Sequence, residues 1–114
     1  MQTVIQPKSF LAAAKATGMS AEEREALVDY VAANPTAGDL IQGTGGCRKL
    51  RHRRPGTGKS GGYRVITFFD GEDIPVALLT VFGKNERDNL TKTERNALAT
   101  ATAQMAAELR NLGK

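Results

Sequence analysis

The basic residues of this 114-residue chain are concentrated in one short stretch. Residues 47–64, CRKLRHRRPGTGKSGGYR, contain five Arg, two Lys and the only His of the chain, and no acid. No Asp or Glu occurs between Asp39 and Asp70, whereas the rest of the chain carries nine basic and twelve acidic residues. A solvated basic loop is the simplest alternative, but ordinary surfaces intersperse both signs of charge. This asymmetry therefore favours a polyanionic partner.

The glycines of this stretch match two nucleotide-binding motifs only in part. Residues 58–60, GKS, resemble the end of a P-loop, but the first glycine of that motif falls on Arg53. Residues 56–61, GTGKSG, match the dinucleotide pattern G-x-G-x-x-G. Both motifs must open a helix that faces the phosphates, and here β-rich sequence follows. We interpret the segment as a hairpin loop that carries Lys59 at its tip.

The residues before this loop place basic side chains on one face of a strand. Because alternate side chains of a strand share a face, Lys49, Arg51 and Arg53 lie together and Leu50 points to the other side. Such a row binds phosphates in a salt-dependent way. Arginine does not readily lose its proton, so its roles are positioning and charge stabilisation. A lysine among other cations is a candidate general base.

Three further polar residues are expected to join this row. Arg64 begins the next strand across the hairpin, and Lys84 and Asn85 follow the strand after it. A sheet that brings them together forms a cationic patch, which can also stabilise the extra negative charge of a phosphorane-like transition state.

Other chemistries are poorly represented. His52 is alone and is interpreted as a surface residue, Cys47 is interpreted as a small buried residue, and no metal-binding set is recognisable. The aromatic residues near the basic stretch have a core pattern: Tyr63, Phe68, Phe69 and Phe82. Because stacking platforms for single-stranded RNA are lacking, another body is expected to present the RNA.

The elements that must position these residues follow the order β-α-α-β-β-β-α, an α+β fold with a small, mainly antiparallel central sheet. The expected ranges are a strand at 3–6, helices at 7–18 and 20–34, strands at 47–54, 63–70 and 74–83, and a helix at 91–114. Residues 36–46 are interpreted as a glycine-rich loop. The strand at 74–83 is nearly all apolar, so we expect it at the centre of the sheet.

Two helices carry clear start signals and apolar stripes. Ser20 with Glu23, and Thr91 with Glu94, form capping boxes. The stripe expected in the second helix is Ala26, Leu27, Tyr30, Val31 and Ala33. The stripe expected in the last helix is Leu98, Ala101, Met105, Leu109 and Leu112.

The chain as a whole predicts a single domain over residues 1–114. One cysteine cannot form an internal disulfide, which fits a reducing compartment. No apolar run approaches the roughly 20 residues of a membrane helix, and the first residues lack a signal-peptide pattern. We therefore expect a cytoplasmic protein without a membrane partner.

Three segments resemble the RelE/HigB toxins of type II toxin–antitoxin systems, within the RelE/ParE superfamily: NPTAGDLIQGTGGCRKLR, GKSGGYRVITFF and LLTVFGKNERDNLTKTE. The similarity covers about residues 32–94. The resemblance implies a RelE-like fold and an mRNA interferase that enters the ribosomal A site. There the 2′-OH of the message attacks the adjacent phosphate, with no metal or other cofactor. A cognate antitoxin, expected to be a small helix-turn-helix protein, is also implied.

The resemblance assigns roles to individual residues. Lys49 and Arg51 match paired basic positions on a central strand, Arg64 matches the arginine that contacts the scissile phosphate, and Lys84 and Asn85 match active-site positions after the third strand. The remaining basic stretch is then the surface that faces mRNA and rRNA: Arg48, His52, Arg53, Arg54 and Lys59.

One position departs from the family pattern. Some members carry a tyrosine near the start of the last helix, where this chain has Thr91. The general acid is therefore unassigned, with His52 and Lys59 as candidates.

Two other functions stay open at this point. A ParE-like toxin of the same fold inhibits DNA gyrase and needs no cationic active site, so the clustered Lys49, Arg51 and Arg64 speak against it. A non-catalytic module that binds RNA or the ribosome would use the same basic residues, and the sequence does not separate it from a nuclease.

Overall fold

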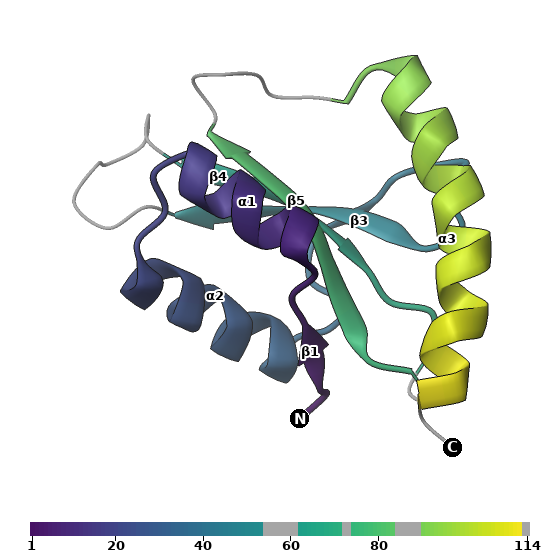
Figure 1. Ribbon diagram of the computed structural model, residues 1–114, viewed down its shortest axis with the longest axis horizontal. Coiled ribbons are helices and arrows are strands. Elements are labelled where there is room, and N and C mark those ends of the chain that lie inside the picture. Colours follow the sequence, from purple (N-terminus) through teal and green to yellow (C-terminus); the bar gives the residue numbers. More distant parts are fainter. Residues whose placement is uncertain (54–61, 72–73, 84–89, 113–114) are drawn as a thin grey trace.

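The chain folds into an α+β structure, seen in a computed structural model that describes residues 1–53, 62–71, 74–83 and 90–112 (Figure 1). Within these residues a five-stranded sheet is accompanied by three helices. The elements are β1 (Val4–Ile5), α1 (Lys8–Ala16), α2 (Ala21–Ala33), β2 (Asp39–Leu40), β3 (Cys47–Arg53), β4 (Gly62–Phe68), β5 (Val76–Gly83) and α3 (Lys92–Leu112). None of the described helices is both long and apolar enough to cross a membrane.

The strands lie in the order β1-β5-β4-β3-β2. β1 runs parallel to β5, and the other neighbours are antiparallel, which confirms the predicted mainly antiparallel sheet. The apolar strand β5 lies inside the sheet, between β1 and β4, as its composition predicts. A β-bulge interrupts the pairing of β5 with β4. Ile66 pairs with Thr80 and Thr67 pairs with Leu78, which leaves Leu79 as the extra residue.

The prediction that residues 36–46 form only a loop was wrong, because this segment contains the edge strand β2. Two residues are too few to show a strand pattern, so no periodicity could indicate it. Gly38, with φ of +96°, brings the chain close to β3; a Cβ there would lie 2.6 Å from the carbonyl oxygen of Lys49. The guanidinium of Arg48 also donates to the Gly38 carbonyl at 3.3 Å.

Replacing Gly38 by Ala is therefore expected to detach β2 from β3. The added methyl group meets backbone atoms that cannot move aside, and left-handed backbone adds strain of about 1–3 kcal/mol. Gly43→Ala is the matched control, because Gly43 also has a positive φ (+78°) but has nothing within 4 Å of the added Cβ. Urea denaturation should show the larger loss for Gly38→Ala; equal losses would contradict the close approach.

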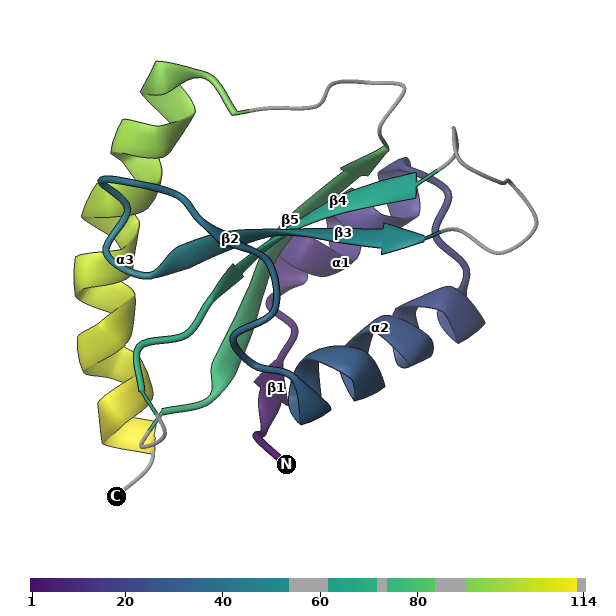
Figure 2. The same cartoon turned by 180° about the vertical axis from the view of Figure 1, so that it is seen from behind.

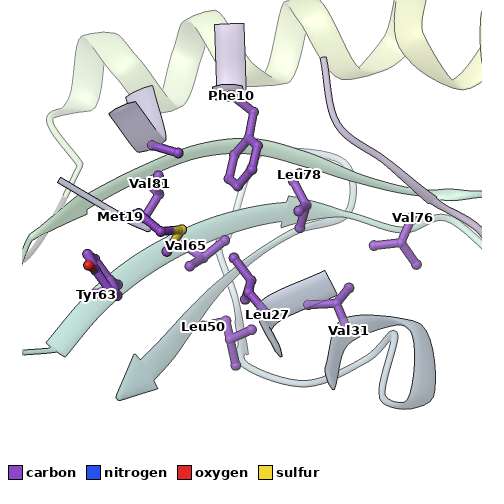
Figure 3. Packing of buried hydrophobic residues seen from close by; sticks show 11 residues of the cluster. Phe10, Met19, Leu27, Val31, Leu50, Tyr63, Val65, Val76, Leu78 and Val81 are labelled. Atoms are coloured by element: carbon purple, nitrogen blue, oxygen red, sulfur yellow. The ribbon is translucent and has the colours of Figure 1, made fainter. Parts of the chain in front are cut away.

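Each face of the sheet carries its own group of buried side chains. Figures 1 and 2 show α1 and α2 together on one side of the sheet and α3 apart from them. The first group joins α1 and α2 to the sheet through Phe10, Leu27 and Val65, all fully buried (Figure 3). The second group includes Leu109 of α3 and Phe68 of β4. The sheet is thus packed on both faces, which fixes the orientation of each alternating side chain.

Both predicted capping boxes are confirmed. The Ser20 hydroxyl accepts from the Glu23 N–H at 3.1 Å, while the Glu23 carboxylate accepts from the Ser20 N–H at 2.8 Å. Thr91 and Glu94 exchange the same pair of bonds at the start of α3. The predicted C-terminal glycine of α1 is also confirmed, because Gly18 follows the helix with a left-handed φ of +80°.

The predicted helix stripes were only partly right. In α2, Leu27 and Val31 are buried, but Ala26, Tyr30 and Ala33 are exposed, because the helix touches the sheet along a narrower line. In α3, Leu109 is buried while Ala101 is exposed, and Thr102 and Ala106 take the inner positions instead. The side chain of Leu112 lies outside the described residues.

A polar contact ties α2 to the sheet. The buried Tyr63 hydroxyl of β4 donates to the Glu23 carboxylate at 3.0 Å. His52 pairs with Tyr63 in the β3–β4 register, and its ring lies 6.5 Å from that of Tyr30. Burial lowers the pKa of His52 below its ordinary value of 6.5, against the opposing attraction of Glu23.

The lowered pKa of His52 predicts a loss of stability in acid. The unfolded chain takes up the His52 proton near pH 6.5, before the folded chain does, so the free energy of unfolding falls as the pH drops through that value. Urea midpoints measured between about pH 7.5 and 5.5 should fall more steeply for the wild type than for His52→Gln. If the urea midpoints of the two proteins fall equally over this pH range, folding does not lower the pKa of His52.

Candidate active site

Three basic side chains lie in a row along β3, on the side of the sheet against which α3 packs. Cys47, fully buried, belongs to the core group under α3, whereas Leu50 belongs to the group under α1 and α2. Side chains alternate along a strand, so Lys49, Arg51 and Arg53 share the α3 side with Cys47. This confirms the predicted separation of the row from Leu50.

Arg64 of β4 joins this row from the neighbouring strand. It pairs with Arg51 in the sheet register, next to the pairs Lys49–Ile66 and Arg53–Gly62. Only 4% of Arg64 is exposed, and a Cβ on Gly62 would lie 3.6 Å from its Nη1 atom. The guanidinium therefore reaches along β4 toward Gly62. We call Lys49, Arg51, Arg53 and Arg64 the cationic face.

The cationic face carries an electrostatic cost. Arg51 and Arg64 are directly opposed, and like charges in such cross-strand pairs destabilise a sheet. A phosphate group bound between the strands reverses this effect, because each guanidinium then faces an anion and can donate two parallel hydrogen bonds. The pair therefore suits a ligand with concentrated negative charge.

Replacing Arg51 by Gln is expected to stabilise the free protein and to weaken RNA binding. Removal of one opposed charge should raise the free energy of unfolding by about 0.2–1 kcal/mol. Lys49→Gln is the comparison variant, because Lys49 pairs with Ile66 on β4 and with Asp39 on β2 and so opposes no basic residue. Denaturation and RNA titration of both variants check this result. A loss of stability in Arg51→Gln that exceeds the loss in Lys49→Gln would contradict the repulsion.

Not all predicted site residues come together. By strand alternation Arg48 and His52 lie on the α1/α2 side, away from the cationic face. Arg48 reaches back to Gly38, and its buried Nε makes no hydrogen bond among the described residues. His52 is half-buried beside Tyr30. Four other predicted residues lie outside the described part of the chain: Arg54, Lys59, Lys84 and Asn85.

A groove adjoins the cationic face at Lys49. It has a volume of about 500 Å³ and lies between β2, β3 and the start of α3. Its lining consists of Asp39, Leu40, Ile41, Gln42, Lys49, Leu90 and Arg95, and we call it the β2–α3 groove. The sequence pointed only to Lys49. The other residues come together because α3 packs on the sheet. The sequence indicated where α3 begins, through the Thr91 capping box, but not where the helix packs.

Two threonines fix the wall of this groove. The Thr102 hydroxyl of α3 donates to the Thr44 carbonyl at 2.7 Å, and both residues are buried. The Thr44 hydroxyl donates to the Ile41 carbonyl at 2.6 Å and accepts from the Cys47 N–H at 3.2 Å. These bonds hold the segment after β2 against α3, so the groove is built from firmly anchored elements.

The described residues offer no group of three or more His, Cys, Asp or Glu side chains that could hold a metal ion. Cys47 is fully buried, as predicted, and its burial raises the pKa of the thiol despite a hydrogen bond from Thr44. The thiol is therefore not activated as a nucleophile. The chemistry of the described site rests on guanidinium and ammonium groups.

The mixed five-stranded sheet and the three helices of the described residues agree with the RelE-like fold expected from the sequence. A family model described as "RelE toxin of RelE / RelB toxin-antitoxin system" matches residues 2–113, nearly the whole chain. The chain therefore belongs to the RelE toxin family, which confirms the resemblance noted in the sequence. As a member, it is the toxin of a toxin–antitoxin system, and an antitoxin is its partner.

Proposed function

We propose that this toxin is a ribosome-dependent mRNA endonuclease that cuts the message in the ribosomal A site. The observation that carries the proposal is the cationic face, in which the nearly buried Arg64 lies opposite Arg51 on a packed sheet. Preorganised cations of this kind stabilise charge that develops at a phosphate in the transition state. A surface that only attracts RNA has no need to bury one of its arginines.

In the proposed reaction the 2′-OH of one nucleotide loses its proton and its oxygen attacks the adjacent phosphorus. The bond from phosphorus to the 5′-oxygen of the next nucleotide breaks, and that oxygen takes up a proton. A 2′,3′-cyclic phosphate remains on the upstream fragment. Arg64 and Arg51 stabilise the negative charge at phosphorus, and Lys49 on the same face is the candidate proton acceptor.

The donor of the second proton stays unassigned. Lys84 and Asn85 are proposed to complete the site from the end of β5, and Arg53, Arg54 and Lys59 to contact RNA. Arg48 and His52, on the other side of the sheet, are proposed to contact rRNA and are poorly placed for the scissile phosphate. His52 is therefore a weaker candidate for the general acid than the sequence alone suggested.

The aromatic residues support dependence on the ribosome. Tyr63, Phe68 and Phe82 are buried, as predicted, and Phe69 is partly buried. Tyr30 is 46% exposed but lies on α2, which packs on the other side of the sheet from the cationic face. A basic face that has no exposed aromatic side chain beside it in the described part of the chain needs the RNA to be held in place for it. The ribosome supplies this function by fixing the message in the A site.

The test is a reconstituted translation reaction with a 5′-labelled message and the purified toxin, with and without ribosomes. Cleavage on ribosomes only is the expected result. An intact message with blocked translation would instead support a non-catalytic ribosome-binding module. An intact message with normal translation would overturn the proposal and bring inhibition of DNA gyrase to the front.

We further propose that the antitoxin is a small helix-turn-helix protein whose acidic segment covers the cationic face, because opposite charge is the simplest way to neutralise it. Hydrogen exchange of the complex should then show protection of β3 and β4. A complex that leaves these strands as exposed as in the free toxin would contradict masking.

A further inference from the structure

A buried hydrogen bond lies directly behind the two paired arginines. Arg51 pairs with Arg64 across β3 and β4, and the next pair along the strands is His52 with Tyr63. Tyr63 belongs to the core group under α1 and α2, so its side chain points to the opposite side of the sheet from Arg64 (Figure 3). Its hydroxyl donates to the Glu23 carboxylate of α2 at 3.0 Å. The residue before Arg64 is therefore bound to a helix behind the sheet.

Glu23 is itself fixed at the start of α2. One of its carboxylate oxygens accepts from Tyr63, and the other accepts from the Ser20 N–H at 2.8 Å. Both bonds have a charged acceptor, which makes them stronger than bonds between neutral groups. Because Tyr63 is only 1% exposed, its hydroxyl cannot turn to bulk water when the carboxylate is removed. Glu23 thus joins the first turn of α2 to the first residues of β4.

The arginine pair needs support at this end of the strands. The like charges of Arg51 and Arg64 weaken the pairing of β3 with β4. α3 is anchored near the other end of β3, at Thr44. The bond between Glu23 and Tyr63 holds β4 from behind, on the side away from the repulsion. A guanidinium that acts on a transition state must be held in its productive geometry to within about 0.5 Å.

We propose that Glu23 and Tyr63 are positioning residues of the active site, which hold Arg64 in the orientation that the reaction needs. They act through the backbone of β4, in which Tyr63 and Arg64 are adjacent. Neither side chain contacts the substrate, because the contact lies on the α1/α2 side of the sheet. The inference rests on the proposed function, since it concerns the arginine assigned to the scissile phosphate.

Two substitutions remove the contact from opposite ends. Tyr63→Phe deletes the hydroxyl and keeps the buried ring, and Glu23→Ala deletes the acceptor. Glu23→Gln is the conservative variant, because its amide oxygen can still accept from Tyr63. Ser20→Ala is the matched control. It removes the hydroxyl that accepts from the Glu23 N–H at 3.1 Å, but it keeps the backbone N–H that donates to the Glu23 carboxylate.

Tyr63→Phe and Glu23→Ala should each slow single-turnover cleavage on ribosomes by about tenfold or more, since misplacing a catalytic group by 1 Å costs up to about 100-fold. Their affinity for the ribosome should stay that of the wild type, because the contact acts on the rate. The double variant should be no slower than the slower single variant, because both changes break one contact. Glu23→Gln and Ser20→Ala should cut nearly as fast as the wild type, although Ser20→Ala weakens the start of the same helix.

Thermal melts first establish which variants fold, and Glu23→Ala provides the test if Tyr63→Phe does not fold. A folded variant without the contact that cuts at the wild-type rate would overturn the inference. Rate losses that multiply in the double variant would also overturn it, because Glu23 and Tyr63 would then act independently. Equal slowing by Ser20→Ala would do the same, since the loss would then come from the helix start in general.

A measurement on the free toxin separates this inference from the proposed function. The heteronuclear NOE of the Arg64 Nε–H, recorded by NMR on isotope-labelled toxin, reports fast motion of the guanidinium. This NOE should fall in Tyr63→Phe and in Glu23→Ala but not in Ser20→Ala. If the wild type cuts no message, such a fall would still support the role of the contact in holding Arg64, and only the proposed function would fail. An NOE that is unchanged in both variants would overturn the inference whatever the cleavage rates.

Discussion

Arg64→Ala is expected to slow message cleavage on ribosomes by about 10²–10³-fold, the usual effect of losing one preorganised donor to a developing negative charge. Arg64 is almost fully buried opposite Arg51, so its guanidinium is held in place before the substrate arrives. Because Arg64 acts mainly on the transition state, single-turnover rates should fall much more than the affinity for the ribosome. Arg64→Lys, which keeps the charge but loses the fork, should fall between the wild type and Arg64→Ala.

Two controls make this result interpretable. Arg110→Ala removes an exposed arginine of α3 and should cleave at the wild-type rate. Thermal melts of Arg64→Ala must show that the protein still folds, because Arg64 is part of the packed sheet. A folded Arg64→Ala variant that binds and cuts like the wild type would remove Arg64 from the active site. Uniform loss of affinity without loss of rate would make it a binding residue only.

Leu27→Ala should destabilise the fold by about 2–5 kcal/mol, the range for truncating a buried leucine. Leu27 is fully buried between α2 and the sheet, in the group that also holds Phe10 and Leu50 (Figure 3). Since Leu50 alternates with the basic residues of β3, loosening this group also disturbs the strand that carries the cationic face. A loss of this size is a large share of the total stability of a small domain.

Leu11→Ala is the matched control for this substitution. Leu11 lies on α1 and is 37% exposed, so the same truncation should cost much less. Urea denaturation of both variants gives the two free energies of unfolding. Similar losses of unfolding free energy in the two variants would contradict the assignment of Leu27 to the core. They would also mean that packing of α2 on the sheet contributes little to the stability of β3.

The elements that the sequence predicts well are those defined by local signals. The capping boxes at Ser20 and Thr91 fix helix starts through residues only three positions apart, and both are present. The alternation of β3 correctly separated Leu50 from its basic neighbours. The sequence also predicted that Arg64 begins the strand across the hairpin, but only the register of the sheet shows that it pairs with Arg51. Short-range patterns therefore indicated the strands and their faces, whereas the register that joins them did not follow from the sequence.

The features that were missed depend on contacts between distant segments. β2 exists because Gly38 allows the chain to approach Lys49, which no periodicity reveals. Thr102 takes an inner position on α3 because its hydroxyl has a partner in Thr44, 58 residues away. Arg95 reaches the β2–α3 groove only because α3 packs on that side of the sheet. Helical spacing places both Thr102 and Arg95 on the side of α3 that carries the apolar stripe, and only their polarity suggests that they face solvent.

The central claim, cleavage by the 2′-OH of the message, is tested most directly by a single-atom change in the substrate. Ribosomes are programmed with two messages, identical except that one carries a 2′-deoxy nucleotide on the 5′ side of the cut. We predict that the toxin cuts the ribose message to a 2′,3′-cyclic phosphate end and leaves the deoxy message intact at that position. Equal cleavage of both messages would contradict the mechanism, and no cleavage of either would contradict the function.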